Sequence, residues 1–140
     1  MRFIGLLLAL MAIGGCDDGA TQVPGRWYSV EQVTAGAALY QHHCAMCHGP
    51  DGSATSAWRT PGPDGNYPPP PLNGSAHTWH HPLDVLDSTI TNGGAEFGGV
   101  MPGFGAVLGA ADRLAIIAWF QSLWSDDIYQ RWQEIDRRSP

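Results

Sequence analysis

The spacing of apolar and polar positions predicts a first helix over about residues 30–44. Ser29 has the properties of an N-cap, and Gln32 three positions later completes a capping box. Gly36 and Tyr40 lie four positions apart, so they share one face of this helix as a small residue beside an aromatic one. We expect a second helix to approach closely at Gly36; ordinary core amphipathicity is the alternative.

The same periodicity predicts three more helices nearer the C-terminus. One begins at residue 82 or 83 and runs to about residue 91. The next, over residues 110–124, is apolar on much of its circumference and carries Asp112 in its first turn, as expected of a buried helix. A short helix over residues 128–136 follows a stop near Ser125, and it either folds back on the domain or docks on a partner.

Residues 49–74 have a different character, because they contain most of the prolines and many glycines. This composition predicts loop rather than helix or strand. A loop of this length is unusual inside a small domain unless it wraps another object.

The N-terminus predicts export and a lipid anchor. Residues 1–15 combine Arg2 with an apolar run too short to span a bilayer, which is typical of a signal peptide. The tetrapeptide that ends at Cys16 resembles a bacterial lipobox, so we expect Cys16 to be acylated; an incidental cysteine after an ordinary signal is the alternative. Asp17 resembles the signal that retains lipoproteins at the inner membrane. We expect residues 16–28 to form a flexible tether.

The rest of the chain has the length of one domain, expected over residues 29–125, with residues 126–140 as an amphipathic helix and tail. The formal net charge of the chain is −6, and it contains no lysine. This charge argues against nucleic acid as a partner, because phosphates are bound by basic patches. It favours a partner whose docking face is basic or neutral.

Cys44, Cys47 and His48 form a C-x-x-C-H motif, which is typical of covalent haem attachment. Two thiols at this spacing can add to the two vinyl groups on one edge of a porphyrin, and the adjacent imidazole can then bind the iron. A redox dithiol is the first alternative, but it belongs in a βαβ setting that is not found here. A zinc site is the second, but the remaining cysteine, Cys16, does not supply the further pair that such a site needs.

Met101 is the candidate for the second axial ligand of the iron. It lies in a glycine-rich loop far enough from His48 in sequence to reach the opposite face of the ring. A thioether is a soft ligand that favours ferrous iron, so Met/His ligation raises the potential. Met46 is confined within the attachment motif, and Met1 and Met11 belong to the signal. Packing of Met101 within the loop is the alternative.

His77, His80 and His81 place three imidazoles within five residues. A copper site, a distal haem ligand and a solvated surface turn are the three interpretations of this cluster.

In the order of its motifs, the chain over about residues 30–124 resembles the class I monohaem cytochromes c of bacteria. The resemblance implies an all-α fold with three core helices around one covalently bound haem c. The long loop, the cluster from His77 to His81 and the extra C-terminal helix depart from the pattern of the family. The resemblance also implies that the first and last core helices cross with Gly36 and Tyr40 against Trp119. A carbonyl within residues 68–71 is then expected to accept a hydrogen bond from the second ring nitrogen of His48.

We therefore expect a lipid-anchored electron carrier on the periplasmic face of the inner membrane that passes single electrons between redox proteins and is not an enzyme. Both axial positions would be filled, by His48 and Met101. The alternatives are a copper-handling or sensing module built on His77, His80 and His81, a cytochrome subunit of a larger oxidoreductase, and a peroxidase, which requires an open axial position.

Overall fold

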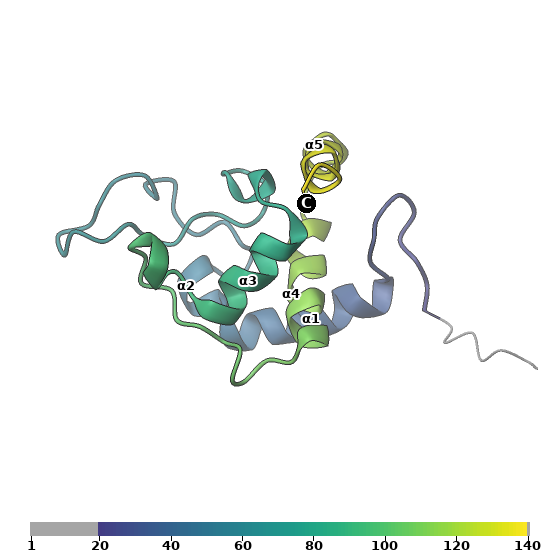
Figure 1. The fold of residues 1–140 in the computed structure, drawn as a ribbon, viewed down its shortest axis with the longest axis horizontal. Coiled ribbons are helices and arrows are strands. Elements are labelled where there is room, and N and C mark those ends of the chain that lie inside the picture. The colour runs from purple at the N-terminus through teal and green to yellow at the C-terminus, as the bar shows by residue number, and fades with distance from the viewer. Residues whose placement is uncertain (1–19, 140) are drawn as a thin grey trace, which may run out of the picture.

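Helices and turns make up the regular structure of residues 20–139, the part of the chain that the computed structural model describes; the only β-type pairing within them is an isolated bridge between Gln22 and Ser29. The expected signal peptide and Cys16 lie outside these residues. In chain order the elements are α1 (Val30–His43), α2 (Ala45–His48), η1 (Thr78–His80), α3 (Leu83–Asn92), η2 (Ala95–Phe97), α4 (Ala110–Ser122) and α5 (Asp126–Asp136) (Figure 1). The all-α fold predicted from the sequence is confirmed, and residues 49–74 form the expected long loop.

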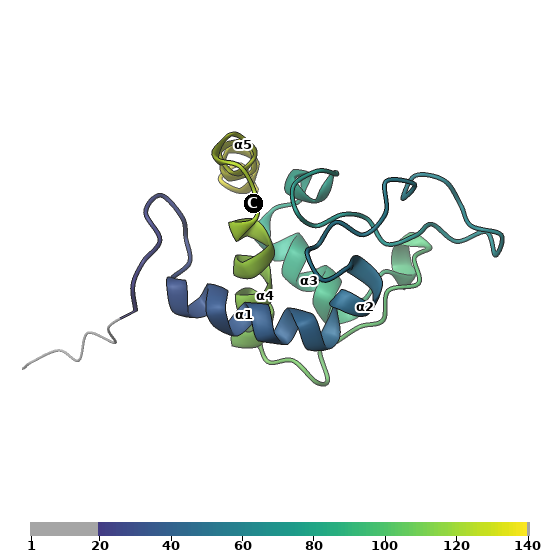
Figure 2. The ribbon, with the colours of Figure 1, turned by 180° about the vertical axis from the view of Figure 1, so that it is seen from behind.

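The crossing of α1 and α4 is the main packing contact of the domain, and both views show the two helices crossing at a steep angle (Figures 1 and 2). A Cβ atom at Gly36 would lie only 1.9 Å from the carbonyl oxygen of Ala115, so the backbones touch where glycine has no side chain. One turn further along α1, the Tyr40 ring lies with its centroid 3.9 Å from that of Trp119. The predicted crossing at Gly36 and Tyr40 is confirmed.

The start of α1 is held by the predicted capping box. The Ser29 hydroxyl accepts a hydrogen bond from the Gln32 amide at 3.2 Å, and the Gln32 side chain accepts one from the Ser29 amide at 3.0 Å. The box satisfies two backbone donors that a helix start would otherwise leave unpaired. The box therefore fixes α1 to begin directly after Ser29.

Residues 21–28, expected to belong to the tether, fold back onto α4 and α5. The Trp27 indole donates to the Gln121 side chain at 2.7 Å, and the Trp27 amide donates to the Tyr129 hydroxyl at 3.1 Å. Tyr28 is buried. Two aromatic side chains in this segment supply enough apolar surface to hold it against the domain.

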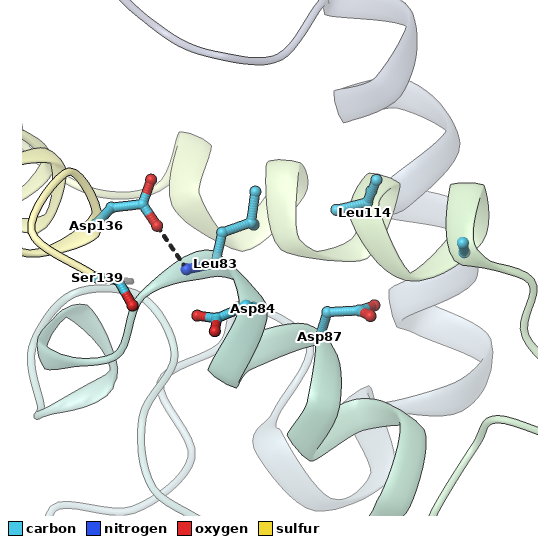
Figure 3. A pocket seen from close by; sticks show the side chains of 7 residues that line it. Leu83, Asp84, Asp87, Leu114, Asp136 and Ser139 are labelled. Atoms are coloured by element: carbon cyan, nitrogen blue, oxygen red, sulfur yellow. Dashed lines mark hydrogen bonds between the residues drawn. The ribbon is translucent and has the colours of Figure 1, made fainter.

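The C-terminal helix α5 also folds back on the domain, which is one of the two placements that the sequence allowed. Tyr129 and Trp132 are buried, and the Ser125 hydroxyl caps the helix by accepting from the Ile128 amide. At its other end, Asp136 accepts a hydrogen bond from the Leu83 amide at 2.7 Å, so α5 caps α3 across a surface groove (Figure 3). The helix begins at Asp126, two residues earlier than predicted.

None of the helices within residues 20–139 has both the length and the apolar content needed to cross a membrane.

Candidate haem-binding site

Cys44 joins α1 to α2, so the attachment motif sits directly at the end of the helix that α4 crosses. Both thiols are free; Cys44 is half-buried, and Cys47 is exposed. Burial, with a smaller contribution from the neighbouring Cys47, raises the pKa of the Cys44 thiol to about 11. The Cys44 thiol is therefore protonated at neutral pH and little prone to adventitious oxidation before attachment.

His48 is buried, and its orientation is set by the proline-rich loop. Its Nδ1 lies 3.0 Å from the carbonyl oxygen of Pro70. Because a carbonyl only accepts, the imidazole must carry its proton on Nδ1, which leaves the Nε2 lone pair free to bind a metal. Burial lowers the pKa of His48, and the bond to Pro70 partly opposes this, so the neutral form that can act as a ligand is favoured.

The loop is fastened over α2 by backbone hydrogen bonds. The amides of Leu72 and Asn73 both donate to the carbonyl oxygen of Gly52, at 2.7 and 3.2 Å, and the Ala54 amide donates to the carbonyl of His48. The predicted acceptor within residues 68–71 is thus Pro70, a choice that the sequence did not decide.

Met101 lies in the loop after η2, where its backbone is held by two glycines at the end of α3. The Gly94 amide donates to the Met101 carbonyl at 2.9 Å, and a Cβ atom at Gly93 would lie only 2.5 Å from the same oxygen. The Phe104 amide donates to the carbonyl of Ile90, which ties the loop to α3 again. Met101 is half-buried and packs against the hydrophobic core. The sequence alone does not single out Gly93, because its contact with Met101 forms only when the loop has folded back on α3.

The rings of His77 and His81 meet edge-on with centroids 5.4 Å apart, but His77 and His80 also pack against different tryptophans. The His77 ring stacks on Trp58, with centroids 4.6 Å apart and the planes 17° from parallel, whereas the His80 ring meets Trp79 edge-on at 3.9 Å. Among the residues from 20 to 139, no three His, Cys, Asp or Glu side chains form a group that could hold a metal ion. The copper alternative therefore has no support in the arrangement of His77, His80 and His81.

The burial of His77 and His81 makes the stability of this turn dependent on pH. Burial lowers the pKa of both imidazoles from the ordinary value of 6.5, and for His77 the neighbouring charges of His81, His80 and Arg59 add to the effect. The unfolded chain therefore binds more protons, so stability is full above pH 6.5 and is lost as the pH falls through that value toward the lowered pKa.

We expect the melting temperature of the holoprotein to fall by several degrees between pH 7 and pH 5, and the variant His77→Phe to lose part of that dependence while keeping the stack on Trp58. Thermal unfolding followed by circular dichroism measures both. The control is Ala38→Gln on the exposed face of α1, which changes no titrating group and should leave the pH dependence unchanged. An identical pH dependence in His77→Phe and wild type would contradict this assignment.

The donor set of this site fits covalently bound haem: two free thiols at the required spacing, followed by a buried neutral imidazole with Nε2 available. Residues 31–120 match the sequence model of the family described as cytochrome C oxidase, cbb3-type, subunit III. A search of curated proteins found no match, and a search of solved structures also found none. The matched segment contains the C-x-x-C-H motif and implies covalent haem c, consistent with attachment at Cys44 and Cys47. The chain therefore belongs to the cbb3-type subunit III family of class I c-type cytochromes, whose haem transfers electrons.

Proposed function

We propose that this protein is a monohaem electron carrier in which His48 and Met101 are the axial iron ligands. The observation that carries the proposal is the hydrogen bond from His48 Nδ1 to the Pro70 carbonyl. This bond keeps the proton on Nδ1 and leaves Nε2 free, in a buried side chain. A ligand histidine oriented in this way by a backbone carbonyl is the usual arrangement at metal centres. When bound, the haem supplies a reversible one-electron change at its iron.

We assign Met101 as the second ligand because its backbone is held in a fixed position. Its backbone is fixed by Gly93 and Gly94, so its thioether starts from a defined position rather than from a mobile loop. If both side chains bind the iron, no coordination position is left for a substrate. The protein then contributes burial, a soft ligand and a docking surface, which suits electron transfer between proteins rather than catalysis.

We further propose that the domain is held on the periplasmic face of the inner membrane by a lipid on Cys16. Two or more acyl chains hold a protein on a bilayer essentially permanently. The amide of Thr21 donates to Glu31 at 2.9 Å, and its carbonyl accepts from the Val30 amide, so the domain is engaged from Thr21 onward. A lipid on Cys16 would thus leave a spacer of no more than about 17 Å of extended chain. Such a spacer favours partners that are themselves in or on the membrane.

Replacing Cys16 with serine tests the anchor. We expect the wild-type holoprotein in the membrane fraction, requiring detergent for release, and Cys16→Ser in the soluble periplasmic fraction with an unchanged haem spectrum. Fractionation followed by absorbance of the reduced haem measures this, and mass spectrometry of the wild-type N-terminus detects the acyl chains. The matched control is Ser53→Ala on the exposed loop, which should stay with the membrane. Membrane retention of Cys16→Ser, without acyl chains on the wild type, would refute the anchor.

A second candidate function is that of a cytochrome subunit within a larger oxidoreductase. It is favoured by the description of the matched family, which names a subunit of an oxidase. Purification in mild detergent separates the two: a stable stoichiometric complex supports the subunit, and an isolated cytochrome that exchanges electrons rapidly with several membrane partners supports the carrier.

A further inference from the structure

The proline run that orients His48 lacks backbone hydrogen-bond donors. Prolines have no backbone N–H group, so within residues 68–71 backbone hydrogen bonds can be made only by the carbonyl oxygens. The position of the Pro70 carbonyl, and with it the bond to His48, therefore depends on the bonds of the Leu72 and Asn73 amides to Gly52 and on what the neighbouring carbonyls accept.

Three consecutive carbonyls, at the end of this run and in the residue after it, accept hydrogen bonds from three different parts of the chain. Pro70 accepts from His48 of α2. Pro71 accepts from the Thr78 hydroxyl of η1 at 2.9 Å, in a fully buried contact, and Leu72 accepts from the Trp124 indole, just after α4, at 2.7 Å. The bond to His48 is thus one end of a row whose other two members are supplied by the C-terminal half of the chain.

The donors of this row are in turn held by α5. The Trp132 indole donates at 3.0 Å to the carbonyl of His81, the residue that directly follows η1. The rings of Trp132 and Trp124 lie with centroids 6.2 Å apart, so the two indoles pack together. Both views show α5 beside the η1 turn (Figures 1 and 2). Trp124 and all of α5 lie outside the segment, residues 31–120, that matches the family.

We propose that α5 is a positioning element for His48: Trp132 fixes η1, Thr78 and Trp124 fix the Pro71 and Leu72 carbonyls, and the Pro70 carbonyl is thereby held on Nδ1 of the imidazole. The inference rests on the proposed role of His48 as an iron ligand. A loosened acceptor would expose the Nδ1 proton to exchange and weaken the electron donation of the ring. The haem potential would then shift to a more positive value.

The test uses the reduced holoprotein and two variants. Trp132→Phe removes the α5 donor that holds η1, and Thr78→Val removes one donor of the row itself. The matched control is Trp27→Phe, which also removes an indole N–H from a part-buried hydrogen bond, the one to Gln121, but lies outside the row. The two readouts are the hydrogen-exchange rate of the His48 Nδ1 proton by nuclear magnetic resonance and the midpoint potential.

We expect Trp132→Phe and Thr78→Val to speed exchange of the Nδ1 proton about fivefold to tenfold, as for the loss of one hydrogen bond, and to raise the potential, with neither change in Trp27→Phe. If Trp132→Phe does not fold, Asp136→Ala, which frees the end of α5 from α3, takes its place. Exchange and potential unchanged in the α5 variant, or changed equally in the control, would overturn the role of α5. Ring protons of His48 without a haem ring-current shift in the wild type would overturn the proposed ligand, and the inference with it.

Discussion

Replacing Gly36 with alanine is expected to destabilise the holoprotein by about 3 kcal/mol or more, although alanine is the better helix former. In an exposed helix the change would add about 1 kcal/mol of stability through propensity alone. Here the new Cβ would lie 1.9 Å from the Ala115 carbonyl oxygen and 3.0 Å from the Cβ of Trp119. The first of these atoms is backbone, so no side-chain rotation can relieve the clash. α1 and α4 would have to move apart, which would also open the stack of Tyr40 on Trp119.

Chemical denaturation followed by circular dichroism measures this loss. The matched control is Ala35→Gly, the neighbouring exposed position of α1, which should cost only the propensity difference of about 1 kcal/mol. A loss of 3 kcal/mol is a large share of the 5–15 kcal/mol that small domains usually possess, so partial unfolding at growth temperature is expected. A Gly36→Ala protein as stable as the wild type would show that the helix crossing tolerates separation.

Features encoded within a few residues were predictable from the sequence. The capping box of Ser29 and Gln32 is an example, since its partners are three positions apart and need no tertiary contact. The C-x-x-C-H motif is another, because the spacing of its thiols is itself the requirement for attachment. The close approach at Gly36 was predictable from its spacing to Tyr40, but the helix that meets it was predictable only through the resemblance to class I cytochromes c.

Features that depend on contacts distant in the chain were not predictable. Residues 21–28 were expected to belong to a spacer because polar and small residues dominate their neighbourhood, but the partners of Trp27 are Gln121 and Tyr129, about a hundred positions away. The choice of Pro70 among four prolines is likewise decided by the bonds of its neighbours to Thr78 and Trp124. No local pattern carries this information, because the bonds form only when the C-terminal half of the chain has packed.

Replacing Met101 with alanine is expected to leave the haem attached but to change its electronic properties. Attachment depends on Cys44 and Cys47, which the substitution does not touch. The local fold should persist, because the bond from Gly94 is made to the Met101 backbone carbonyl, which alanine retains. The ferric sulfur-to-iron charge-transfer band should disappear, and the potential should fall by on the order of 100 mV, because the soft ligand that favours ferrous iron is gone.

Absorbance spectroscopy and redox titration measure these changes, and added cyanide reports whether the axial position has opened. The control is Met46→Ala, whose side chain is 95% exposed within the attachment motif and should alter none of the three readouts. A band that survives in Met101→Ala would exclude Met101 as the ligand. A wild type that already binds cyanide rapidly would favour the peroxidase alternative, since that chemistry requires the open position that a bound Met101 thioether would fill.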